Sequence, residues 1–113
     1  MALTPSLLVA PAYAASSAGA AVLTVGASTR VSIKTILLNN LNTSAEVVKI
    51  YVGVGGVGAG NSNNVIQVSV AASSSVILDI PFPLILSATD KLYVSTTTAS
   101  MVVLTVTGKT ESV

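Results

Sequence analysis

The sequence RVSIKTILLN at residues 30–39 alternates along its length and predicts a β-strand. Successive side chains of a strand point to opposite faces, so the alternation defines two sets of residues. The strand is followed by NNLNTS at residues 39–44, residue types that bond their own backbone and favour turns. One face of the strand would carry Val31, Ile33, Thr35 and Leu37, and the other would carry Arg30, Ser32, Lys34 and Ile36.

The rest of the chain repeats this pattern of short strands and turns. Residues 45–54 place Val48, Ile50 and Val52 on one side of a strand, and turns recur about every 8–12 residues. No segment has a helical period. The sequence therefore predicts an all-β fold, an antiparallel β-sandwich or jelly roll of about seven to eight strands. Further strands are predicted at residues 20–25, 65–70, 76–80, 84–86, 91–96 and 101–107, with a break in pairing at Pro81 and Pro83.

Residues 1–19 are expected to form an extended N-terminal arm, and residues 20–113 the β-sandwich domain. Small residues and prolines dominate the first segment, so a disordered tail is the alternative. Its apolar and aromatic side chains are costly to leave in water, which favours an arm laid on a neighbouring subunit.

Neither a secretory signal nor a membrane span is expected. The apolar run between Pro5 and Pro11 is short and lacks the positively charged segment that precedes it in a signal peptide. No run of residues is long and apolar enough for a spanning helix.

Composition points away from catalysis. Hydrophobic residues make up 51% of the 113 residues, charged residues make up 8%, and the formal net charge is +1. Such sparse charge gives no basic surface for nucleic acid or an anionic membrane, so neither is an expected partner. Without His or Cys, the chain cannot form the triads, zinc sites or disulfides built on them. We therefore expect no enzyme, no cofactor and no metal site, and we expect association with other chains.

Residues 53–64, GVGGVGAGNSNN, are predicted to form a long flexible hairpin loop, either a conformable contact or an exposed tip. A phosphate-binding loop needs a lysine and a following helix, and here a predicted strand follows instead. Nucleotide binding is therefore not expected. Asp79 and Asp90 could form a carboxylate pair across a hairpin, but no aromatic stacking platform accompanies them. They are predicted to be a strand-face residue and a turn residue, and no calcium-binding spacing includes them.

The predicted interface residues lie in the arm, in the loop and at outward strand positions. Tyr51 and Tyr93 occupy outward positions where an interface anchor and cross-strand packing are both open. The complete set is Leu7, Leu8, Val9, Tyr13, Tyr51, Val57 and Tyr93.

Five segments carry a resemblance to a known group of proteins: LLNN at 37–40, TSAEVVKIY at 43–51, SSVILDIP at 74–81, LSATDKLYV at 86–94 and VVLTVTG at 102–108. In their order they resemble small structural proteins of tailed-bacteriophage virions. That group usually has Gly-Asp where this chain has Thr89-Asp90. The resemblance implies a β-sandwich on a capsid, tail or fibre, with no chemistry of its own.

These features together predict a non-enzymatic bacteriophage virion structural protein. The first expectation is a capsid decoration (cement) protein that stabilises the particle by packing between subunits. Its expected partners are copies of itself, with a trimer favoured, and the major capsid protein or tail proteins. Two alternatives stay open: a tail or fibre component that binds a receptor or carbohydrate, and an exported surface-layer or pilus-like subunit.

Overall fold

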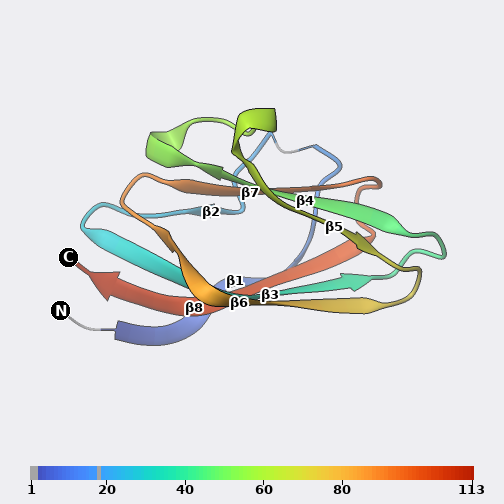
Figure 1. Ribbon diagram of the computed structural model, residues 1–113, viewed down its shortest axis with the longest axis horizontal. Coiled ribbons are helices and arrows are strands. Elements are labelled where there is room, and N and C mark those ends of the chain that lie inside the picture. Colours follow the sequence, from blue (N-terminus) through green and yellow to red (C-terminus); the bar gives the residue numbers. More distant parts are fainter. Residues whose placement is uncertain (1–2, 18) are drawn as a thin grey trace.

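Two four-stranded antiparallel β-sheets pack face to face in the computed structural model, which describes residues 3–17 and 19–113 (Figure 1). The first sheet has the strand order β1-β8-β3-β6, and the second sheet has the order β2-β7-β4-β5. The predicted antiparallel β-sandwich is confirmed. The first sheet contains β1 (Leu3–Tyr13), β8 (Val102–Ser112), β3 (Thr29–Asn40) and β6 (Ser75–Leu86), and the second contains β2 (Leu23–Thr24), β7 (Lys91–Thr96), β4 (Glu46–Gly53) and β5 (Asn64–Val70).

The hydrophobic core lies between the sheets and is built from alternate residues of the strands. In β4, Val48 and Ile50 are buried, as the alternation predicts, and Leu92 and Val94 of β7 join the same core. Burying one aliphatic side chain is worth about 1.5–3 kcal/mol, so this layer is the main source of stability. The first sheet contributes Val31, Ile33, Ile36, Leu38, Leu86, Val102, Leu104 and Val106.

A β-bulge in the middle of β3 reverses the predicted faces in the second half of that strand. The pairing of β3 with both of its neighbours shifts between Ile33 and Thr35. Ile36 and Leu38 therefore point into the core, where they are buried, whereas Leu37 points outward. This differs from simple alternation because a bulge adds one residue to a strand and inverts every side chain after it.

The segment predicted as an arm forms β1, an edge strand of the first sheet. β1 pairs antiparallel with β8, ending with Tyr13 opposite Val103, and Leu8 packs against the core. An extended backbone needs hydrogen-bond partners, and the edge of β8 supplies them within the same chain. The sandwich in this structure thus includes β1, which the division into an arm at 1–19 and a sandwich at 20–113 places outside it.

The predicted proline break lies inside one continuous edge strand, β6. Its pairing with β3 passes from Leu84 to Asp79, so the ladder skips the residues between them. Proline donates no ladder hydrogen bond and is tolerated at a sheet edge, which is where β6 lies. β8 extends to Ser112, beyond its predicted end, whereas β2 has only two residues. In the described part of the chain, no helix has the length and apolar character to cross a membrane.

Candidate interaction surfaces

The outer face of the first sheet carries a shallow groove of about 280 Å³ at one end. Leu37 lies between its cross-strand partners, Ile77 of β6 and Thr105 of β8. Val103 lies further along β8 and faces Tyr13 of β1. Ile77 and Tyr13 are 67% and 60% exposed, so apolar surface meets solvent here. We call this feature the apolar groove; its outward residues are Leu37, Asn39, Ser75, Ile77, Val103 and Thr105.

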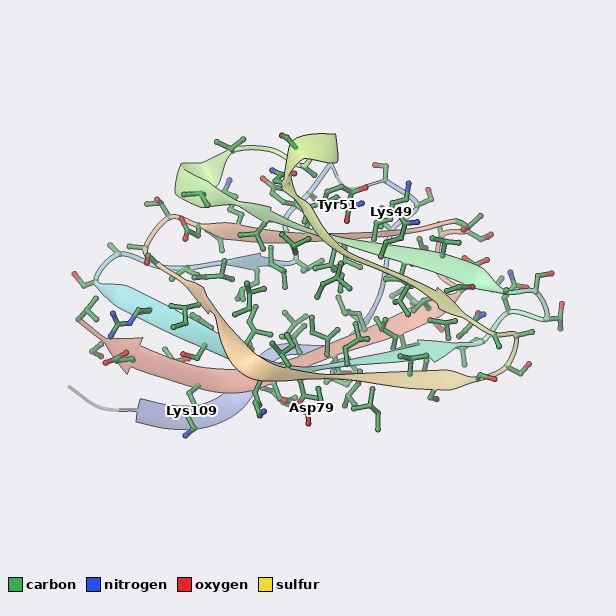
Figure 2. The ribbon with its side chains drawn as sticks, viewed as in Figure 1. Lys49, Tyr51, Asp79 and Lys109 are labelled. Atoms are coloured by element: carbon green, nitrogen blue, oxygen red, sulfur yellow. The ribbon has the colours of Figure 1, made fainter. Side chains whose placement is uncertain are left out.

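The charged residues of this face lie toward its other end. Lys34 and Asp79 form an exposed ion pair at 3.3 Å. Arg30 donates to Glu111 through Nη2 at 2.7 Å and through Nε at 2.9 Å. Figure 2 shows Asp79 and Lys109 on the outside of the first sheet. No charged residue lines the apolar groove, so we call its end of the face the apolar half. The other end, the charged half, carries these charged groups together with the exposed Leu7 and Ile85.

The outer face of the second sheet carries a larger, polar groove of about 590 Å³. Lys49 of β4 lies there between Gln67 of β5 and Ser95 of β7, and Tyr51 stands next to it (Figure 2). None of the described residues that line this groove is a carboxylate, so Asp79 and Asp90 do not meet there. Within residues 3–17 and 19–113, no cluster of acidic side chains could hold a metal ion. The groove is a hydrogen-bonding surface with one cation and one aromatic ring.

The connection between β4 and β5, residues 53–64, is named the glycine loop below. It contains two short 3₁₀ turns. The Gly55 N–H donates to Oδ1 of Asp90 at 2.9 Å, which ties the loop to the turn before β7. The side-chain amide of Asn63 donates to the Gly58 carbonyl at 2.9 Å. The loop predicted to be flexible is thus held by hydrogen bonds at both of its ends.

The glycine loop also presents apolar side chains to solvent. Val54 and Val57 are 69% and 61% exposed. Residues 53–64 carry no charged side chain. The loop is therefore a hydrogen-bonded projection with an apolar, uncharged tip.

Four of the seven interface residues predicted from the sequence are accessible, but they do not form one surface. Leu7 and Tyr13 are exposed on β1, in the first sheet. Tyr51 is half-buried in the polar groove of the second sheet, and Val57 is exposed on the glycine loop.

The other three predicted interface residues pack inside the monomer. Tyr93 is only 5% exposed, because its ring lies against the backbone where the glycine loop begins. A Cβ atom at Gly53 would lie 3.1 Å from that ring. Leu8 and Val9 are half-buried against the core. For Tyr93 the structure thus shows packing within the monomer, one of the two roles that its sequence position left open.

Sequence reasoning missed the residues that build the apolar groove. The alternation places Leu37 on the same face as Val31 and Ile33, because the bulge in β3 leaves no mark in the local sequence pattern. For Ile77 the sequence did indicate an outward position, because the alternation of residues 76–80 places Ile77 on the same face as the charged Asp79. Val103 could be placed beside Leu37 only once the strand order was known.

The carboxylate of Glu46 is almost fully buried, and it acts in the structure of the turns. Glu46 is 1% exposed; its Oε1 accepts a hydrogen bond from the Thr98 N–H at 2.7 Å, and its Oε2 accepts one from Nδ2 of Asn42 at 3.1 Å. Burial alone would raise the pKa of Glu46, but the hydrogen bonds from Thr98 and Asn42 favour the carboxylate and leave the pKa below its ordinary value of 4.5. Glu46 thereby joins two turns at one end of the sandwich.

Comparison with known proteins gives structural likeness only. No protein-family model matches the chain, and no curated protein matches its sequence. Among solved structures, one similar chain comes from Bacillus endospore appendages, which are described as a novel family of disulfide-linked pili. The alignment covers 98% of this chain and 88% of that chain, with 17% identity and a TM-score of 0.57. A chain of the T13 IBDV viral particle aligns over 98% of this chain and 30% of that chain, with 14% identity and a TM-score of 0.47. The first likeness shows that this β-sandwich fold is shared with a pilus subunit.

Proposed function

We propose that this chain is a non-enzymatic structural subunit that assembles with copies of itself. The observation that carries the proposal is the apolar half of the first sheet, where Tyr13 and Ile77 are exposed beside the uncharged apolar groove. Contiguous exposed apolar surface on a small protein is typical of an interaction site. Association would remove this surface from water at about 25 cal/mol per Å², offset by the entropy lost on binding.

The weak charge of the chain supports the same proposal. A formal net charge of +1 over 113 residues produces little long-range repulsion between identical copies. Proteins that stay monomeric at high concentration usually carry a larger net charge. Copies of this chain can therefore be crowded together at small electrostatic cost.

A finer proposal places the subunit in a virion, as a capsid decoration protein of a tailed bacteriophage. It is supported by the sequence resemblance at residues 37–40, 43–51, 74–81, 86–94 and 102–108. On a capsid, many weak contacts form at once, so the avidity of the layer exceeds the affinity of one contact. The partners would be neighbouring copies and the major capsid protein.

The second candidate is a subunit of a pilus-like filament. It is supported by the fold shared with a pilus chain over 88% of that chain and by an elongated shape of 45 × 26 × 21 Å. The pili named in that comparison are disulfide-linked, whereas this chain has no cysteine. A filament of this chain would therefore be held by non-covalent contacts between its subunits.

Electron microscopy of the purified, concentrated chain tests the proposal and separates the two candidates. Filaments with a regular subunit repeat would support the pilus-like subunit. Discrete closed oligomers would support the decoration protein. A sample that contains only single subunits of 11.3 kDa at every concentration would overturn self-assembly as the function.

A further inference from the structure

We infer that the glycine loop of one copy docks into the apolar groove of the next copy. This inference rests on the proposed self-assembly and names the contact that would produce it. The two surfaces match in chemistry. Residues 53–64 carry no charged side chain, and neither do the residues that line the groove. Contact between them would bury apolar surface without stripping water from an ion.

The loop and the groove both offer aliphatic side chains for a contact. Val54 and Val57 project from the glycine loop and are the most exposed valines on that side of the molecule. The groove offers about 280 Å³, with Leu37 and Val103 among its apolar lining. Small-molecule sites begin at roughly 300 Å³ and enclose most of their ligand. A shallow groove of this size suits a few aliphatic side chains of another protein.

The backbone of the glycine loop is already ordered for such a contact. Asp90 accepts a hydrogen bond from Gly55, and Oδ1 of Asn63 accepts one from the Gly60 N–H at 2.8 Å. Ordering a mobile loop on binding costs conformational entropy, and prior ordering lowers that cost. The ordered loop therefore loses less conformational entropy when its valines bind than a disordered glycine-rich segment would lose.

The positions of the two surfaces require a second copy. The glycine loop lies above the second sheet, whereas the apolar groove lies on the outer face of the first sheet, on the opposite side of the sandwich (Figure 1). A loop therefore cannot reach the groove of its own chain. Contact between two different surfaces is heterologous, and its repetition gives a ring or an open filament.

The charged half of the first sheet restricts where the loop can dock. Lys34, Asp79 and the Arg30–Glu111 pair lie on that half. Covering these groups with an apolar loop would remove their water without providing new partners, which is unfavourable. The uncharged end of the face is thus the part of it that accepts the loop.

A pair of charge substitutions tests the contact by sedimentation velocity over a concentration series. Ile77→Lys places a cation in the groove, and Val57→Glu places an anion on the loop. We expect each variant alone to associate at least about tenfold more weakly than the wild type, which corresponds to about 1.4 kcal/mol. We expect an equimolar mixture of the two variants to recover association, because the cation and anion then meet at alternate contacts.

Matched controls use sites of similar exposure elsewhere on the molecule. Ile85→Lys lies on β6, as Ile77 does, and Ile85 is 57% exposed. Val113→Glu lies at the C-terminus, and Val113 is 60% exposed, close to the 61% of Val57. Both controls should associate as the wild type does, and a circular dichroism melt confirms that all four variants are folded.

The outcomes distinguish this contact from self-assembly itself. If Ile77→Lys weakens association and Val57→Glu does not, the groove contacts another surface and the inference is overturned, while the proposed function stands. If neither substitution changes an association that the wild type shows, the inference is likewise overturned. If the wild type does not associate at any concentration, the proposed function fails, and the inference fails with it.

Discussion

At Gly108 the backbone of β8 passes so close to β3 that a Cβ atom would collide with the carbonyl oxygen of Ser32. The same Cβ would lie 2.9 Å from Cδ1 of Leu8, on β1. Gly108 stands opposite Ile33, beside the bulge that turns Leu37 outward. One glycine thus allows three strands to approach one another at the point where the outer face of the first sheet is defined.

We expect Gly108→Ala to lower the free energy of unfolding by about 1–3 kcal/mol, the usual cost of forcing an extra carbon into a packed interior. Gly58→Ala is the matched control, because a Cβ atom there meets nothing within 4 Å. Urea denaturation of both variants measures the difference. Equal stability of the two variants would contradict the close approach of β8 and β3.

Thr89 marks a second constrained position, where the backbone φ is +71°. A left-handed conformation destabilises an L-residue by roughly 1–2 kcal/mol, and glycine avoids this strain. Glycine also loses more conformational entropy on folding, which offsets the gain by about 0.5–1 kcal/mol. Thr89→Gly should therefore stabilise the fold by up to about 1 kcal/mol, whereas Thr43→Gly, at an exposed turn position with ordinary φ, should not. Thermal unfolding distinguishes these two results, and a loss of stability in Thr89→Gly would show that the threonine side chain is needed there.

The lowered pKa of Glu46 predicts a specific loss of stability in acid. In the folded state its pKa lies below the unfolded value of 4.5, so the folded protein gains stability from the carboxylate above pH 4.5. That contribution is lost as the pH falls from 4.5 through the folded pKa. Glu46→Gln should be less stable than the wild type at neutral pH, and the gap should narrow in acid. Denaturation curves at a series of pH values measure the gap, and a gap independent of pH would refute this role for Glu46.

At the scale of elements, local alternation predicted which segments are strands, but it could not predict which strands meet. Residues 45–54 alternate without interruption, and their buried face was predicted correctly. β3 alternates equally well, but its bulge depends on the pairing with β6 and β8, so Ile36 and Leu37 were assigned to the wrong faces. β1 was missed because its partner, β8, lies at the far end of the chain. The apolar groove combines three strands, so its position followed only from the topology.

Deleting residues 3–13 tests the position of β1. If β1 is an edge strand, its removal uncovers β8 and the core beneath Leu8 and Val9, so the melting temperature should fall by several degrees. Adding a synthetic peptide of residues 3–13 should raise the melting temperature again, because a ligand that binds the folded state stabilises that state. An unchanged melting temperature would instead support a separate arm that contacts only other subunits.

At the scale of the whole molecule, the features that concern function lie on opposite sides of an elongated sandwich. The polar groove and the glycine loop belong to the second sheet, and the apolar groove belongs to the first. None of the described residues that line either groove is a carboxylate. The two sides of the sandwich therefore present different surfaces, a polar one that contains Lys49 and an uncharged apolar one.

Light-scattering mass of the purified wild-type chain, measured as concentration rises, tests self-assembly most directly. We expect a mass that increases from that of the 11.3 kDa subunit toward multiples of it, because each contact buries apolar surface that the monomer exposes. A mass that stays at 11.3 kDa into the millimolar range would contradict the account.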